Sequence, residues 1–221
     1  MPSSSEPCGS TKSSSHGECI LRTHLAIALL AVGSVLAIGV PAVAADRPLA
    51  SIIESRCAHC HGSEGESASA IYPRLVAQNA EYVAKQLKDF RDGRRKSEAM
   101  SEMAKDLTDG EIAALAEFFA GKPPKARRTS DADLASVGRF IYSRGNSYSG
   151  VPACATCHGP SAHGTTQLPR LAGQHPAYLE TQLKDFNKRT RTNDNAIMHT
   201  VAAKLTELEI VAVSMYLGGL E

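Results

Sequence analysis

The 221-residue sequence predicts an all-α fold arranged as two tandem helical domains of similar length. Three observations lead to this prediction. Apolar residues recur at helical spacing in several segments, no run of alternating apolar residues is long enough for a sheet, and a set of short segments occurs twice along the chain. We expect residues 46–124 to form the first domain and residues 125–221 to form the second.

Three pairs of matching segments define the repeat. Members of a pair are 96 or 98 residues apart: residues 72–78, 82–90 and 107–112 match residues 168–174, 178–186 and 205–210. Residues 121–128, between the two copies, contain two prolines, which discourage helix formation and give the segment the composition of a linker.

The individual helices follow in chain order. Residues 48–56 predict a short amphipathic helix, and residues 81–91 predict a longer one with Tyr82, Gln86 and Phe90 on one face. Residues 131–144 predict the first helix of the second domain.

The last helix of each domain has a recognisable start. Thr108 and Glu111 have the spacing of a capping box, as do Thr206 and Glu209. The apolar residues that follow each box lie at helical spacing, so we expect the two domains to close in the same way.

The N-terminal stretch has the features of a secretory signal peptide. Residues 25–45 carry no charge, and Ala42, Val43 and Ala44 give a small-residue cleavage pattern. We therefore expect residues 1–45 to be removed on export to the periplasm. The alternative is an uncleaved membrane anchor, because about 20 apolar residues can span a bilayer.

The sequence Cys-x-x-Cys-His, at Cys57, Cys60 and His61, recurs at Cys154, Cys157 and His158. This spacing is typical of covalent c-type haem attachment. Two thiols three positions apart can each add to a haem vinyl group, and the adjacent imidazole can bind the iron. We therefore predict two covalently bound haem c groups, with the four cysteines as attachment residues and the two histidines as iron ligands.

Other readings of the motif are less favoured. A thioredoxin-like thiol pair needs a βαβ context, and a zinc site needs four clustered ligands. Neither is evident in this sequence. A formal net charge of +1 argues against a nucleic-acid partner, which usually requires a strongly basic face.

Methionine is the predicted sixth ligand of each iron, because its soft thioether favours Fe(II). Met100 lies seven residues before Leu107, and Met198 lies seven residues before Leu205. We therefore predict Met100 and Met198 as iron ligands. Met103, which lacks a methionine counterpart in the second repeat, stays as an alternative to Met100.

Further residues have predicted supporting roles. The carbonyls of Pro73 and Pro169 are expected to accept hydrogen bonds from the ligand histidines, which would fix the imidazole rings. Basic residues gather before each methionine, and from these we expect Arg94 and Arg191 to help hold the haem propionates. The remaining histidines of the region after the leader are expected to have no role at the iron: His59, His163, His175 and His199.

Together, these residues resemble the cytochrome c4 family. The resemblance rests on the tandem Cys-x-x-Cys-His motifs, the Pro-Arg-Leu-x-x-Gln segments, the Gln-Leu-x-x-Phe segments and the final methionine-containing stretches, and it covers residues 46–221. It implies two cytochrome c-type domains related by pseudo-twofold symmetry, with the propionates near their interface. One departure is Ala77, where the family usually has glycine and the second repeat has Gly173; we expect this to alter the backbone beside the first haem.

The resemblance also implies a function. Such a protein is a periplasmic electron carrier between a quinol-oxidising (bc1-type) complex and a terminal cytochrome oxidase, often loosely held at the membrane. We expect a monomer with both irons six-coordinate and no enzymatic activity of its own. One alternative is the electron-accepting subunit of a flavoprotein dehydrogenase, such as sulfide dehydrogenase. Another is a dihaem enzyme, which would need an open or unusually ligated haem.

Overall fold

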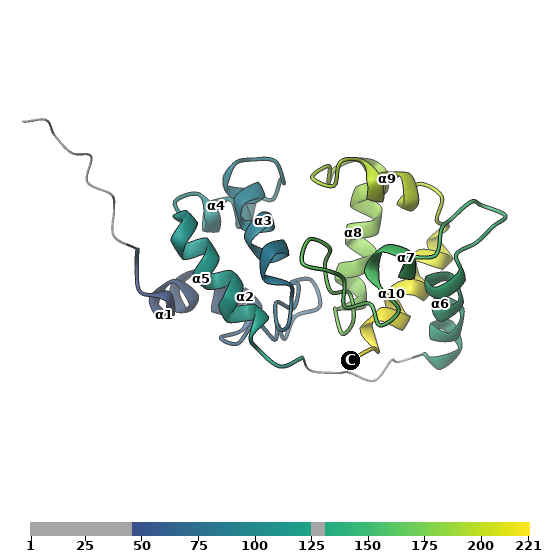
Figure 1. The fold of residues 1–221 in the computed structure, drawn as a ribbon, viewed down its shortest axis with the longest axis horizontal. Helices are drawn as coiled ribbons and strands as arrows, with labels where there is room; N and C mark the ends of the chain where they lie inside the picture. Colours follow the sequence, from purple (N-terminus) through teal and green to yellow (C-terminus); the bar gives the residue numbers. More distant parts are fainter. Residues whose placement is uncertain (1–45, 125–130) are drawn as a thin grey trace, which may run out of the picture. The chain divides into compact units, whose positions relative to one another are not determined.

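The computed structural model describes residues 46–124 and 131–221, which belong to one compact unit, Ala44–Glu221. The predicted leader and residues 125–130 of the predicted linker lie outside the described residues. Within the described ranges the secondary structure is helical, and the only strand-like pairing is an isolated antiparallel bridge between Asn146 and Val151. The all-α prediction is therefore confirmed (Figure 1).

The first half of the described chain, residues 46–124, has six helical segments. They are α1 (Leu49–Ile52), the π-helix η1 (Ile53–Cys57), α2 (Ala58–His61), α3 (Ala80–Arg91), α4 (Glu98–Ala104) and α5 (Asp109–Ala120). The helix predicted over residues 48–56 begins one residue later and continues without a break into the Cys-x-x-Cys-His motif. The helix predicted over residues 81–91 is α3.

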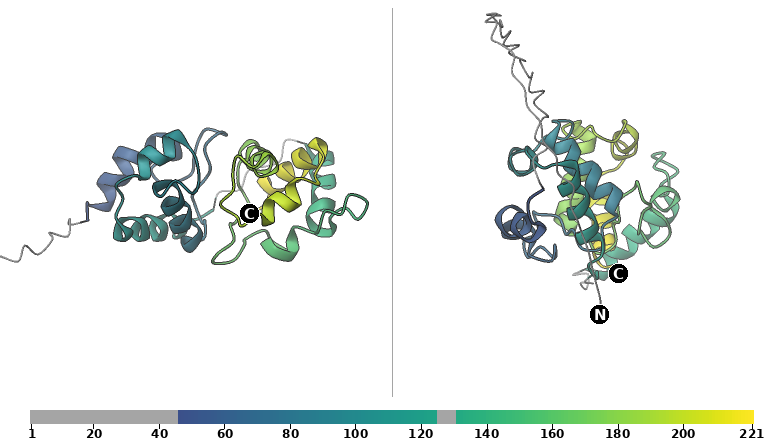
Figure 2. Two further views of the ribbon diagram at one scale, coloured as in Figure 1. Left: turned by 90° about the horizontal axis from the view of Figure 1, so that it is seen from above. Right: turned by 60° about the vertical axis from the view of Figure 1, so that its left-hand side comes forward.

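The second half, residues 131–221, has five helices. They are α6 (Ala132–Arg144), α7 (Ala155–His158), α8 (Pro176–Lys188), α9 (Ile197–Ala202) and α10 (Glu207–Gly218). The helix predicted over residues 131–144 is α6, with Asp131 as its N-cap. In this half a loop separates the first helix from the motif, whereas in the first half the two are continuous. The helices of each half stay grouped in the further views of Figure 2.

Both predicted capping boxes are present. The hydroxyl of Thr108 accepts from the backbone N–H of Glu111, and the carboxylate of Glu111 accepts from the backbone N–H of Thr108. Thr206 and Glu209 make the same reciprocal pair at the start of α10. The two final helices therefore begin in the same way, as the sequence predicts.

Each final helix contributes strongly to the core of its half. In the first half, Ile112, Leu115 and Phe119 of α5 are buried in a cluster that also includes residues of α1, η1 and α3. In the second half, α10 packs closely against α6, and an added Cβ at Gly138 would lie only 1.9 Å from the carbonyl oxygen of Ala212. The close contact between α6 and α10 therefore requires glycine at position 138, because a side chain there would clash with the backbone of Ala212.

The backbone at Ala77 corrects one expectation. Ala77 has a φ of 54°, and Gly173, its counterpart, has a φ of 72°. The N–H of Ala77 donates to the carbonyl of Phe119 at 3.0 Å, and that of Gly173 donates to the carbonyl of Leu217 at 2.9 Å. The substitution has therefore not changed the backbone path: alanine occupies a left-handed conformation that favours glycine.

The two halves meet through reciprocal polar contacts. The side chain of Gln78 binds the backbone of Arg170, and the side chain of Gln174 binds the backbone of Arg74. Gln78 and Gln174 are counterparts in the repeat, and so are Arg74 and Arg170. Each glutamine thus makes the same contact in the opposite direction, as expected for two halves related by a pseudo-twofold axis.

Candidate functional site

The first Cys-x-x-Cys-His motif spans the junction of two helices. Cys57 ends the π-helix η1, and Cys60 and His61 lie on α2. The second motif has Cys154 as the N-cap of α7, with Cys157 and His158 on that helix. Cys57 and Cys154, the first cysteine of each motif, are half-buried, and burial raises the pKa of their free thiols, as they are before haem attachment, to about 11.

The histidines of the motifs are buried and oriented. His61 is 5% exposed and His158 is 7% exposed. The Nδ1 of His61 donates to the carbonyl of Pro73 at 2.9 Å, and the Nδ1 of His158 donates to that of Pro169 at 3.4 Å. These contacts confirm the predicted role of the two prolines.

The protonation state of these histidines suits iron binding. Burial lowers the pKa of both imidazoles, an effect that the hydrogen bonds to the proline carbonyls partly oppose. Each ring is therefore neutral at pH 7, and the Nδ1 proton leaves Nε2 as the nitrogen with a free lone pair. Two thiols and a neutral, oriented imidazole form a donor set that fits haem c.

The predicted methionine ligands lie on short helices that the sequence analysis did not identify. Met100 lies on α4, where its N–H donates to the hydroxyl of the N-cap Ser97, and its half-buried side chain packs against the first core. Met198 lies on α9, where its N–H donates to the Asp194 carboxylate at 2.7 Å. Met103 is also half-buried on α4, so helix position alone does not separate it from Met100.

The arginines differ from the prediction in their register. Arg94 is exposed and paired with Asp89 and Asp92. The structural counterpart of Arg191 is Arg95: both are buried, and their guanidinium groups stack on Phe90 and Phe186 at 4.6 and 4.4 Å from the ring centroids. Arg94 is therefore not the counterpart of Arg191, and the role of the two arginines at the haem propionates stays a prediction.

Arg95 and Arg191 also connect the two halves. Arg95 donates to the hydroxyl of Tyr178 at 3.0 Å and to Gln182 at 2.7 Å, and Arg191 donates to the hydroxyl of Tyr82 at 3.0 Å. Helices α3 and α8 therefore take part in a polar network across the interface, and Tyr82 of the face predicted over residues 81–91 belongs to it.

The histidines expected to have no role at the iron lie in different environments. His59 is exposed, His163 contacts the carbonyl of Glu221, and His199 contacts the carbonyl of Phe186. His175 is buried, and its Nε2 lies 3.0 Å from the carbonyl of Ser67. This interface contact could not be predicted from the repeat, because the first repeat has Asn79 at the matching place.

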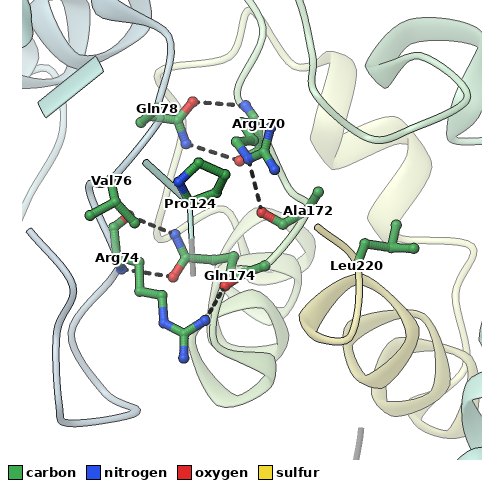
Figure 3. A pocket seen from close by; sticks show the side chains of 9 residues that line it. Arg74, Val76, Gln78, Pro124, Arg170, Ala172, Gln174 and Leu220 are labelled. Atoms are coloured by element: carbon green, nitrogen blue, oxygen red, sulfur yellow. Dashed lines mark hydrogen bonds between the residues drawn. The ribbon is translucent and has the colours of Figure 1, made fainter. Parts of the chain in front are cut away.

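A small hollow lies between the two Pro-Arg-Leu-x-x-Gln segments (Figure 3). Its lining includes Arg74, Gln78, Arg170 and Gln174. The space available is about 10 Å³, roughly enough for one water molecule. This hollow is too small for a cofactor or an organic substrate.

Comparison with known proteins agrees with this geometry. Residues 44–119 match the family described as "Cytochrome C oxidase, cbb3-type, subunit III", and residues 142–221 match the family described as "Cytochrome c". The chain is 44% identical to cytochrome c4 of Thiocapsa roseopersicina over 168 residues, which cover 74% of this chain and 86% of the relative.

Two further relatives are informative. The crystal structure of reduced recombinant cytochrome c4 from Pseudomonas stutzeri matches with a TM-score of 0.74 and 34% identity, covering 80% of this chain and 100% of that chain. A thiosulfate dehydrogenase electron acceptor of Thiomonas intermedia is 37% identical over 73% of this chain and 76% of its own length. With two cytochrome c domains, each holding a covalently bound haem c, the chain belongs to the cytochrome c4 family of dihaem electron carriers.

Proposed function

We propose that this protein is a periplasmic carrier that takes electrons from a quinol-oxidising (bc1-type) complex and delivers them to a terminal cytochrome oxidase. The observation that carries the proposal is the presence, in both halves, of a buried and neutral histidine oriented by a proline carbonyl beside a pair of cysteines. Two such sites in one chain give a capacity of two electrons.

The proposed attachment residues are Cys57 and Cys60 for one haem and Cys154 and Cys157 for the other. His61 and Met100 bind the first iron, and His158 and Met198 bind the second. A haem c bound in this way supplies one reversible electron through its Fe(II)/Fe(III) couple. Thioether ligation raises the reduction potential, which suits delivery of electrons to an oxidase.

The protein positions the ligand side chains and excludes water from them; it supplies no reaction chemistry of its own. The proline carbonyls fix the imidazole rings, and the burial of both histidines keeps water away from them. If a histidine and a methionine both bind each iron, no position on the iron would be open to a substrate, so the protein would act as a carrier without enzymatic activity of its own.

A haemochrome assay combined with intact mass tests the cofactor and the processing. We expect two c-type haems per chain, and a mass that corresponds to a mature chain beginning near residue 45 or 46. One haem, or none, would contradict the proposal. A mass that retains the leader would favour the membrane-anchor alternative and contradict only the predicted cleavage.

The axial ligands are tested by a matched pair of variants. Met100→Ala should keep its haem, lower one reduction potential and allow carbon monoxide to bind one ferrous iron. Met103→Ala, on the same helix, should change none of these. The reverse pattern would make Met103 the ligand.

A second candidate function is electron acceptance from a dehydrogenase. The 37% identity to a thiosulfate dehydrogenase electron acceptor favours it, and a flavoprotein such as sulfide dehydrogenase is the donor that the sequence analysis considered. The two candidates differ in their donor. Reduction of the isolated protein by a quinol-oxidising complex, compared with co-purification of a dehydrogenase from the native organism, distinguishes them.

A further inference from the structure

The side-chain amides of Gln78 and Gln174 each hold a backbone segment of the opposite half. The N–H of Arg74 donates to Oε1 of Gln174 at 2.8 Å, and Nε2 of Gln174 donates to the carbonyl of Arg74 at 2.9 Å. The N–H of Arg170 donates to Oε1 of Gln78 at 2.7 Å, and Nε2 of Gln78 donates to the carbonyl of Arg170 at 2.9 Å. Figure 3 shows both pairs.

The glutamines are held firmly in these positions. Gln78 is 7% exposed and Gln174 is 6% exposed. Each Oε1 also accepts from the backbone N–H of the following residue, Asn79 or His175, which is the N-cap of α3 or α8. Both glutamine side chains therefore have little freedom to leave their partners.

The peptide groups that they contact are those that orient the ligand histidines. The carbonyl of Pro73 and the N–H of Arg74 belong to one peptide group. Its oxygen accepts from Nδ1 of His61, and its N–H donates to Gln174 of the other half. The peptide group between Pro169 and Arg170 joins His158 to Gln78 in the same way.

We propose that each half tunes the reduction potential of the haem in the other half through this peptide group. Gln174 is thus a positioning residue for His61, and Gln78 is one for His158. The inference rests on the proposed ligation of iron by these two histidines.

The sign of the effect follows from hydrogen-bond cooperativity. A peptide N–H that donates to an amide oxygen leaves its own carbonyl oxygen more negative and a stronger acceptor. A stronger acceptor at Nδ1 increases the basicity of the imidazole as a ligand. A more basic ligand stabilises Fe(III) relative to Fe(II), so loss of the glutamine should raise the reduction potential of the haem in the opposite half.

The geometry predicts unequal effects in the two halves. The distance from Nδ1 to the proline oxygen is 2.9 Å for His61 and 3.4 Å for His158. Because hydrogen bonds weaken with distance, we expect the loss of Gln174 to have the larger effect.

The test replaces each glutamine by methionine, which has nearly the same shape but no amide oxygen. The holoprotein is titrated by spectroelectrochemistry, and Met198→His, which lowers the second potential strongly, assigns the two waves. In Gln174→Met we expect the Fe(II)/Fe(III) ratio of the first haem, measured at a fixed electrode potential, to rise about threefold. This corresponds to an increase of about 28 mV in its reduction potential, at 59 mV per tenfold change. In Gln78→Met we expect a smaller rise, confined to the second haem.

Asn79→Ala is the matched control. The Asn79 side chain crosses the same interface to the carbonyls of Leu168 and His163 and contacts neither of the two peptide groups. Although Asn79 is the N-cap residue of α3, its side chain makes no capping hydrogen bond. Both potentials should stay at their native values in this variant. If Gln174→Met fails to fold, Gln174→Asn provides the same test, because its shorter side chain cannot reach Arg74 from the same backbone position.

Several results would overturn the inference. These are a shift of the haem in the glutamine's own half, equal shifts of both haems, no shift, or an equally large shift in Asn79→Ala. The ferric absorption spectrum tests the ligation separately, because it reports the spin state of each iron. Low-spin irons with unshifted potentials would refute the tuning and leave the proposed ligation intact, whereas a high-spin iron in the native protein would contradict the ligation itself.

Discussion

Exchange of Ala77 and Gly173 is a direct test of the backbone described above. Both positions have a left-handed conformation, with φ values of 54° and 72°. Both also lie in the segment between the proline that orients a ligand histidine and the glutamine that contacts the other half. Ala77→Gly should therefore stabilise the protein, and Gly173→Ala should destabilise it.

The magnitude is a difference of two terms. A residue with a Cβ in the left-handed region costs about 1–2 kcal/mol. Replacing alanine by glycine removes this cost, but glycine loses more conformational entropy on folding, which offsets about 0.5–1 kcal/mol of the stabilisation. The net change is about 0.5–1 kcal/mol for each variant, with opposite signs, and corresponds to about 1–4 °C in the melting temperature of a chain of this size.

Urea unfolding of the holoprotein, followed by far-ultraviolet circular dichroism, measures both variants against the native protein. The double exchange, Ala77→Gly with Gly173→Ala, serves as the control and should lie close to the native stability, because the two sites are separate. If Ala77→Gly lowers the unfolding midpoint, or if Gly173→Ala raises it, the assignment of a strained alanine is wrong.

Three further predictions concern packing, acid stability and docking. Gly138→Ala should destabilise the second half by about 2 kcal/mol, because backbone atoms of Ala212 block the new methyl group. Gly110→Ala, where the new methyl group meets only the flexible side chain of Asp46, should stay close to native stability in the same urea unfolding experiment; equal effects of the two variants would contradict the close contact between α6 and α10. Hydrogen bonds from Arg47 lower the pKa of Glu111 from 4.5 to about 2. The stabilisation from this ionised carboxylate is therefore complete above pH 4.5 and is lost as the pH falls towards 2. Arg47→Met should reduce this part of the acid transition, because only the backbone N–H groups of Thr108 and residue 47 still bind the carboxylate. A pH profile that is the same in both proteins would exclude the ion pair as its source. Finally, if basic residues guide docking to the electron-accepting partner, added salt should slow oxidation of the reduced protein by that partner about tenfold between low and physiological ionic strength. A stopped-flow rate that does not change with ionic strength would exclude electrostatic docking.

The sequence predicted the helices whose signals are local. The capping boxes at Thr108 and Thr206 lie within three residues of their partners, and both helices start where these boxes predict. Helices α4 and α9 were not predicted, because they are only seven and six residues long. So short a segment shows no clear helical periodicity, although the side chains that hold the two helix starts, Ser97 and Asp194, are close in sequence.

The contacts between the halves could not be predicted in the same way. The bonds of Gln78 and Gln174 connect residues 92 and 100 positions apart. Their one sequence signal is the retention of Pro-Arg-Leu-x-x-Gln in both repeats, which shows that the segment matters without showing what it contacts. The counterpart of Arg191 could not be identified from the sequence for a related reason, because the repeat offset changes between 96 and 98 residues and so leaves the register of a single arginine ambiguous.

The reciprocal glutamine contacts also bear on how the two halves stay together. An interface whose two sides are the same patch is the kind that normally joins two copies of one subunit. Here one polypeptide supplies both sides, so that docking of the halves is an intramolecular event with an effective concentration on the order of millimolar. The pairing is therefore insensitive to dilution, and the two haem-binding sites keep a constant relative geometry however scarce the protein is.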